Sequence, residues 1–85
     1  MCTLISVRNK STYPVVSVYI DDRLYFSDVI TFSGYRQCPS GSITITVFDN
    51  REKCIFNVYF SAAACHSYTL EVYNTCCKFI PAESF

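Results

Sequence analysis

The feature that most constrains this chain is a two-residue alternation of apolar and polar side chains that runs from residue 14 to residue 73. Successive side chains of a β-strand point to opposite faces, so the alternation is typical of strands with one face in a core. The apolar runs are short and are separated by Asp, Asn, Ser and Gly, which favour turns. Helix-forming stretches are nearly absent from the 85 residues. We therefore expect one all-β domain.

The alternation defines a series of short strands. The predicted strands are residues 15–20, 24–26, 42–48, 54–60 and 66–73, with two flanking pieces at 3–8 and 78–85. A hairpin centred on Arg51 would set Phe48 opposite Cys54. Because Cys54 and Phe56 are two residues apart in the same predicted strand, they should point to the same face, and we expect the thiol of Cys54 to face inward.

About seven short strands with frequent turn signals favour an antiparallel immunoglobulin-like sandwich stapled by disulfides. A closed barrel is the alternative. We divide the chain into an N-terminal arm at residues 1–12, which acts as a connector or an edge strand, a β-sandwich core at 13–75, and a C-terminal cysteine pair and tail at 76–85. The outward faces also carry apolar side chains, so they are either an aromatic interface or buried on both sides.

Cysteine is unusually frequent in this sequence. The six cysteines are Cys2, Cys38, Cys54, Cys65, Cys76 and Cys77. Such a density indicates either an oxidising compartment or a metal site. Structural zinc sites usually pair ligands two to four residues apart, and the sequence has no C-x-x-C. We therefore expect disulfides, with no metal and no cofactor.

Strand geometry suggests partners for most of these cysteines. Folding the predicted strands back on one another brings Cys38 and Cys65 to the same end of the sheet, so they are plausible intrachain partners. Cys54 lies at the other end, where it could bond either Cys76 or Cys77. Six cysteines allow fifteen pairings, so the sequence leaves the connectivity open.

The N-terminal arm has the features of a connector. Chain ends are the segments best able to reach another molecule. We expect Cys2 and the remaining cysteine of the adjacent pair to form a bond between subunits. The arm would add as a strand to a neighbour's sheet edge, with Leu4, Ile5 and Val7 as its buried contacts.

Three segments resemble a known family. Residues 16–22 (VSVYIDD), 39–47 (PSGSITITV) and 65–70 (CHSYTL) are similar, in order, to the V-x-V-Y-x-[DN]-G, P-x-G-x-[YI]-x-[VI]-x-V and G-x-x-Y-T-L runs of a bacterial secreted β-sandwich domain of unknown function. Asp22 and Cys65 replace two glycines of that pattern. The resemblance implies a secreted or cell-surface, non-catalytic domain. In plan alone, the chain is also similar to the small cysteine-bearing subunits of bacterial endospore appendages.

Charge and composition narrow the function further. Seven basic and seven acidic residues balance, which disfavours nucleic-acid binding, and no segment is long enough to span a membrane. His66 is the only histidine, and its neighbour Cys65 would project to the other side of a strand, so we expect no enzyme. We expect a structural subunit that self-assembles into a disulfide-cross-linked extracellular or spore-surface fibre or layer. The alternative is a monomeric secreted or cell-surface binding module with internal disulfides only.

Overall fold

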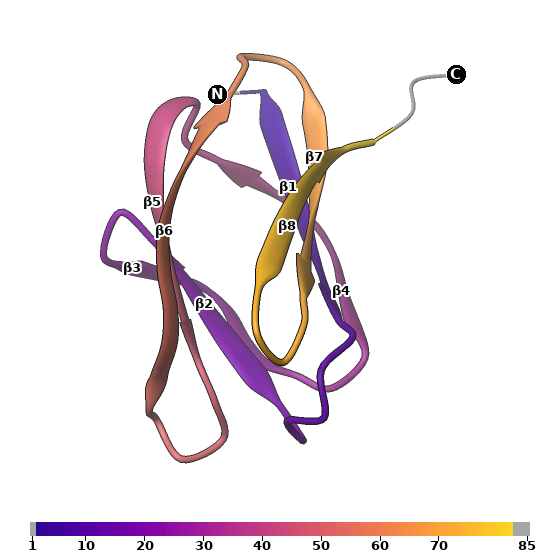
Figure 1. The fold of residues 1–85 in the computed structure, drawn as a ribbon. Helices are drawn as coiled ribbons and strands as arrows, with labels where there is room; N and C mark the ends of the chain where they lie inside the picture. The colour runs from indigo at the N-terminus through magenta and orange to yellow at the C-terminus, as the bar shows by residue number, and fades with distance from the viewer. Residues whose placement is uncertain (1, 83–85) are drawn as a thin grey trace.

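The chain folds as two β-sheets packed face to face. In this computed structural model, residues 2–82 are described, and they contain eight strands (Figure 1). The strands are β1 (Thr3–Asn9), β2 (Val16–Ile20), β3 (Arg23–Val29), β4 (Phe32–Cys38), β5 (Gly41–Phe48), β6 (Cys54–Ala62), β7 (Ser67–Val72) and β8 (Cys77–Pro81). The described part of the chain has no apolar helix of membrane-spanning length.

Each sheet has four strands among the described residues. One sheet has the order β4-β1-β7-β8 and the other has the order β3-β2-β5-β6. All neighbouring strands are antiparallel except β1 and β7, which are parallel. The all-β class and the two-sheet architecture are confirmed. The expectation of about seven strands was one too few, and the expectation of a wholly antiparallel arrangement fails at the β1–β7 pair.

The core lies between the two sheets and is built from the aliphatic positions of the alternation. Its fully buried side chains include Ile5, Val7, Val16, Val18, Ile20, Ile43, Ile45, Val47, Leu70 and Val72. Burying one such side chain is worth about 1.5–3 kcal/mol relative to leaving it exposed. Both sheets contribute to this core, through β1 and β7 on one side and β2 and β5 on the other, so the core forms only when the two sheets pack together.

The N-terminal segment is an internal strand, not an extended arm. Strand β1 lies between β4 and β7, with Ile5 opposite Arg36 on one side and Tyr68 on the other. The side chains of Ile5 and Val7 are fully buried in the chain's own core. Leu4 points to the outer face and is half-buried. The segment carries the same alternation as the other strands, so it buries its apolar face in the same way.

The predicted C-terminal tail is also part of a sheet. Strand β8 pairs with β7, which sets Cys77 opposite Val72 and Phe79 opposite Leu70. The Phe79 ring stacks on the Tyr68 ring with centroids 4.5 Å apart. Residues 83–85 of the predicted tail lie outside the described residues. Through residue 82 the core therefore extends beyond the predicted limits of 13–75 at both ends.

A two-residue turn joins β2 to β3. Ile20 pairs with Arg23, and the two loop residues, Asp21 and Asp22, have φ angles of 49° and 66°. Positive φ at both loop residues defines the turn geometry that matches the twist of a hairpin, and it favours Asn-Gly or Asp-Gly. Asp21 also accepts a hydrogen bond from the Thr44 N–H at 3.0 Å. Asp21 is therefore tied into the sheet, whereas Asp22 adopts a conformation better suited to glycine.

We predict that Asp22→Gly stabilises the protein by about 0.5–1 kcal/mol, because glycine has no Cβ to penalise the left-handed conformation. Asp21→Gly is the matched control, since it relieves the same backbone penalty but removes the acceptor for the Thr44 N–H. Urea unfolding of the oxidised proteins measures both effects. A gain in stability for Asp21→Gly that equals the gain for Asp22→Gly would contradict the assignment.

Candidate functional site

The disulfide lies at the end of the molecule that carries the N-terminus. Cys2 is bonded to Cys65, with Cα atoms 4.4 Å apart and a sequence separation of 63. The predicted Cys38–Cys65 pair was wrong. Cys38 does reach this end of the sheet, where it pairs with Thr3, but its side chain points into the core. Because β1 lies between β4 and β7, Cys2 and not Cys38 is the neighbour of Cys65.

Hydrogen bonds around the disulfide fix the loop that carries Cys65. The buried Thr3 hydroxyl donates to the Ala63 carbonyl at 3.0 Å, and the Ala63 N–H donates to the Tyr68 hydroxyl at 2.8 Å. Leu4 N–H donates to the His66 carbonyl at 3.0 Å. Cys65 itself has a φ of 58°. The loop between β6 and β7 is thus held to the start of β1 by both polar contacts and a covalent bond.

Cys54 is on the surface because of a β-bulge. Val47 pairs with Phe56 and Phe48 pairs with Cys54, so the register shifts by one residue between the two pairs. Phe56 therefore faces the core while Cys54 shares the outer face with Phe48. The predicted Phe48–Cys54 pairing is confirmed, but the expectation that Cys54 faces inward was wrong. A bulge adds one residue to one strand and reverses the phase of the alternation, which the sequence pattern alone does not reveal.

The adjacent cysteines occupy the β7–β8 hairpin at the opposite end from the disulfide. The Tyr73 N–H donates to the Cys76 carbonyl at 2.8 Å, which closes the turn. Cys76 is exposed, while Cys77 packs at the edge of the core and is half-buried. Burial, with a smaller contribution from Cys76, raises the pKa of the Cys77 thiol. Neither cysteine is bonded to Cys54 in this structure.

Cys38 is chemically shielded. Its side chain is fully buried, and its thiol donates a weak hydrogen bond to the Arg36 carbonyl at 3.4 Å. Burial raises the pKa of Cys38 to about 11, and the nearby Arg36 offsets this only partly. Since the thiolate is the reactive form, Cys38 behaves as a small apolar core residue at neutral pH. The accessible thiols are therefore those of Cys54 and Cys76, with Cys77 less accessible.

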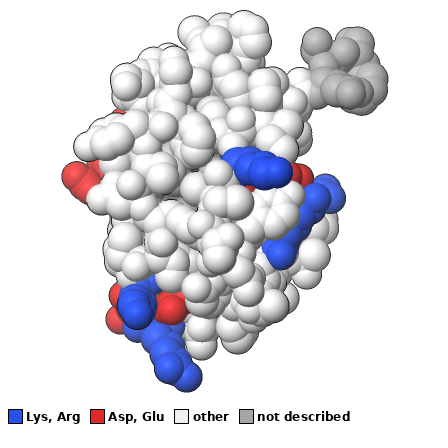
Figure 2. All heavy atoms as spheres, viewed as in Figure 1, with Lys and Arg blue, Asp and Glu red and all other residues white. Residues whose placement is uncertain are grey.

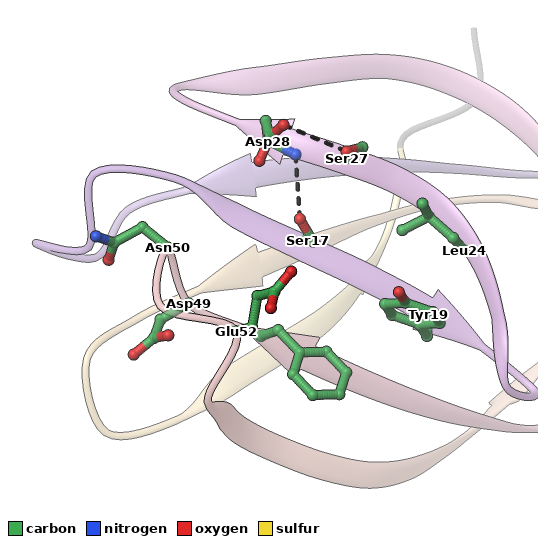
Figure 3. Close-up of a pocket in the computed structure, with 9 residues that line it drawn as sticks. Ser17, Tyr19, Leu24, Ser27, Asp28, Asp49, Asn50 and Glu52 are labelled. Atoms are coloured by element: carbon green, nitrogen blue, oxygen red, sulfur yellow. Dashed lines mark hydrogen bonds between the residues drawn. The ribbon is translucent and has the colours of Figure 1, made fainter.

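A hollow of about 500 Å³ lies on the outer face of the β3-β2-β5-β6 sheet (Figure 3). Its lining residues are Ser17, Tyr19, Leu24, Ser27, Asp28, Phe48, Asp49, Asn50 and Glu52. Tyr19 and Phe48 form one wall, with ring centroids 5.2 Å apart in an edge-to-face arrangement. Beside them, the Asp28 N–H donates to the Ser17 hydroxyl at 3.1 Å. The hollow combines an aromatic wall with a polar rim.

The carboxylates at this hollow have different surroundings. Asp49 accepts hydrogen bonds from the N–H groups of Arg51 and Lys53, both at 2.9 Å, so it serves the β5–β6 turn. The Ser27 hydroxyl donates to Asp28 at 3.4 Å. The Glu52 carboxylate points toward Ser17 (Figure 3). Within residues 2–82 no group of three His, Cys, Asp or Glu side chains has a geometry that could hold a metal ion.

The outward aromatic residues differ in how far neighbouring side chains cover them. Tyr73 lies beneath the ammonium groups of Lys10 and Lys78, at 5.9 and 5.3 Å from its ring centroid. Its hydroxyl donates to Glu71 at 2.8 Å and, together with Lys10 at 3.0 Å, lowers the pKa of that carboxyl. Tyr59 is different, since it is 76% exposed on β6. Phe32 and Tyr35 on β4 are also exposed, at 68% and 50%, so exposed aromatic rings lie on both β4 and β6.

His66 lies in the loop before β7 and is exposed. Its Nδ1 is 2.8 Å from the Ala64 carbonyl, and its neighbour Cys65 is in the disulfide. The one histidine and the accessible thiols of Cys54 and Cys76 thus lie at opposite ends of the molecule, so the fold does not bring them together.

The chain matches no protein-family model, and it matches no curated protein. The function is therefore inferred from the geometry of this chain.

Sequence reasoning missed the Cys2–Cys65 pair, and one signal could have found it. The alternation of Thr3, Ile5 and Val7 equals that of the internal strands, and an internal strand there would bring Cys2 to the end of a neighbouring strand of the same chain.

We predict that the double variant Cys2→Ser/Cys65→Ser is less stable than the parent by about 4 kcal/mol, because the 63-residue closed loop no longer restricts the unfolded chain. Urea unfolding under non-reducing conditions measures the loss. Cys54→Ser is the control and should change stability by less than about 0.5 kcal/mol, since its side chain is exposed. Equal stabilities for the double variant and the parent would contradict the disulfide assignment.

We also predict a fixed order of thiol alkylation in the folded protein. Iodoacetamide at mildly alkaline pH should modify Cys54 and Cys76 first and Cys77 more slowly, because burial raises the pKa of Cys77. Cys38 should react only after unfolding, since its pKa is raised to about 11. Peptide mass spectrometry over time gives the order. Modification of Cys38 as early as Cys54 would show that its burial is wrongly assigned.

Proposed function

We propose that this chain is a non-catalytic structural subunit that self-assembles into a disulfide-cross-linked extracellular or surface fibre or layer. One observation carries the proposal. The internal disulfide closes one end of the sandwich, while the exposed thiols of Cys54 and Cys76, with half-buried Cys77, lie on two hairpins at the other end. A chain with two such positions can bond to more than one neighbour, so covalent joining can propagate.

The internal disulfide also supports the proposed location. Disulfides persist in oxidising surroundings and are rare where thiols are kept reduced. A compartment in which Cys2 and Cys65 stay bonded also allows exposed thiols to oxidise. We infer an extracellular or cell- or spore-surface location from this chemistry.

The bonds between subunits are proposed to involve the cysteines of the two hairpins and not Cys2. In the fold described, Cys2 is bonded within its own chain, and β1 fills a place in its own sheet. We therefore assign the bonds between subunits to Cys54, Cys76 and Cys77, in place of the Cys2 link expected from the sequence. Their exposure and their position on hairpin turns favour contact with another molecule.

We further infer that the sandwich is of immunoglobulin-like character and related to the secreted bacterial domain that it resembles. Two sheets facing each other across an aliphatic core support the first inference. The backbone supports the second, because Asp22 and Cys65 replace glycines of the family pattern and have positive φ angles of 66° and 58°. Those are conformations that glycine adopts at least cost.

A second candidate is a monomeric secreted or cell-surface binding module. The hollow bounded by Tyr19 and Phe48 favours it, since aromatic rings beside polar groups are a common lining of ligand sites. In that case the oxidised protein would remain a single subunit, and reductant would lower its melting temperature without changing its size.

We predict that oxidised protein forms a ladder of multimers on a non-reducing gel and that reductant collapses the ladder to one band. Cys76→Ser/Cys77→Ser should stop at dimers, because Cys54 alone can form one bond. Adding Cys54→Ser to that pair should leave only monomers. Cys38→Ala is the control and should keep the ladder, since this thiol is buried. An oxidised parent that remains wholly monomeric would refute covalent assembly.

A further inference from the structure

The four edge strands of the two sheets differ in how their free edges are protected. Strands β3, β4 and β8 each carry features that discourage pairing with another chain. Strand β3 has Arg23 and Asp28, strand β4 has Arg36, and both show register shifts against their neighbours. Strand β8 is only five residues long and contains Lys78 and Pro81. Charge, proline, short length or bulges therefore hinder these three edges from pairing with another strand.

Strand β6 has almost none of these protections. It spans nine residues, CIFNVYFSA, with no charged residue, proline or glycine. Its one irregularity is the bulge at the start of the strand, and the segment from Phe56 to Ala62 pairs regularly with β5. The inward side chains of Phe56, Val58 and Phe60 are only half-buried. An apolar, uncharged edge of this length is a template for another strand.

The sandwich is open on the side of β6. No backbone hydrogen bond among the described residues joins β6 to β8, and the two edges meet through the Phe60 and Phe79 rings, with centroids 5.0 Å apart. On the opposite side the Arg36 guanidinium donates to the Tyr25 carbonyl and ties β4 to β3. Figure 2, in the orientation of Figure 1, shows a broad uncharged surface where β6 runs, with charges at the lower turn, beside β8 and at the left margin.

We propose that β6 pairs antiparallel with β6 of a second copy, so that the two β3-β2-β5-β6 sheets become one continuous sheet. This proposal deepens the proposed function, on which it rests, by naming the non-covalent joint between subunits. The free N–H and C=O groups of β6 form a row with which an extended strand can pair. A second copy fits because it offers an equally open strand, and because an uncharged edge meets no repulsion from its own copy.

The sequence of β6 is self-complementary about Val58. In an antiparallel pair centred there, Val58 faces Val58 of the second copy and Phe56 faces Phe60. Aromatic and β-branched cross-strand pairs are among the stabilising ones in sheets. On the outer face Asn57 meets Tyr59, which is 76% exposed in the single subunit. The apolar pattern thus matches itself in this register and covers the half-buried side chains.

The joint also determines where the accessible thiols lie. Within one subunit Cys54 is at the start of β6 and Cys76 is in the β7–β8 turn, away from the Cys2–Cys65 end. Antiparallel pairing reverses one copy relative to the other, so the pair carries thiols at its two opposite ends. Disulfides between such ends would join pairs into a linear fibre, which a closed two-fold joint alone cannot do.

The test uses full-length protein that cannot form bonds between subunits, namely Cys54→Ser/Cys76→Ser/Cys77→Ser. Sedimentation over a range of concentrations should show a reversible dimer. Hydrogen exchange should show protection of residues 54–62 that increases with concentration. A protein that stays monomeric at millimolar concentration, or a dimer without added protection in β6, overturns the proposal.

Charge substitutions in the same background test the register. Asn57→Lys/Tyr59→Lys places ammonium groups opposite one another and should weaken the dimer at least about tenfold. Asn57→Glu/Tyr59→Glu should weaken it similarly, and an equimolar mixture of the two variants should recover a heterodimer. Tyr35→Lys, at a half-exposed tyrosine on the β4 edge, is the matched control and should dimerise like its parent. Failure of the mixture to recombine, with both variants folded by circular dichroism, also overturns the proposal.

The outcomes distinguish this joint from the proposed function. A β6 dimer in the background of the three serine substitutions, together with no ladder from the oxidised parent, supports the joint and refutes covalent assembly. A ladder from the parent, together with a monomeric triple-serine protein, supports covalent assembly and refutes the joint.

Discussion

The position of β1 between β4 and β7 is the constraint on which the rest of this structure depends. Strand β4 pairs with no other strand of its sheet within the described residues, so without β1 it would separate from β7 and β8. The same strand brings Ile5 and Val7 into the core and carries Cys2 to Cys65. Backbone pairing, apolar burial and a covalent bond thus act on one seven-residue segment.

This arrangement leaves the molecule asymmetric in two directions. Along the strands, one end is closed by the Cys2–Cys65 bond and the other carries the accessible thiols of Cys54 and Cys76. Across the strands, the β3–β4 side is tied by Arg36, while on the β6–β8 side the rings of Phe60 and Phe79 stack and the described strands share no ladder of backbone hydrogen bonds. The proposed assembly uses both asymmetries, since the open side pairs subunits and the open end cross-links the pairs. A subunit closed on every side would have neither means of propagation.

Much of the fold could be predicted from the period of the sequence, because one buried face imposes alternation on each strand. The strands at Val16–Ile20, Gly41–Phe48 and Ser67–Val72 follow the pattern closely. The positions and partners of the cysteines were harder to predict, for two reasons. The bulge next to Phe48 reverses the phase of Cys54, and the parallel insertion of β1 gives Cys65 a different partner. The bulge leaves no mark in the alternation, and the alternation of β1 indicates a strand without saying which strands lie beside it.

The amino-acid sequence by itself determined that this protein is all-β, that its core is aliphatic, and that its cysteines gather toward strand ends. These properties follow from side-chain period and turn chemistry, which act over a few residues. Only the tertiary structure decided which cysteines bond, which thiols stay accessible and which edge stays open. Those outcomes depend on the order of strands within each sheet, and strand order is set by contacts between segments far apart in the chain.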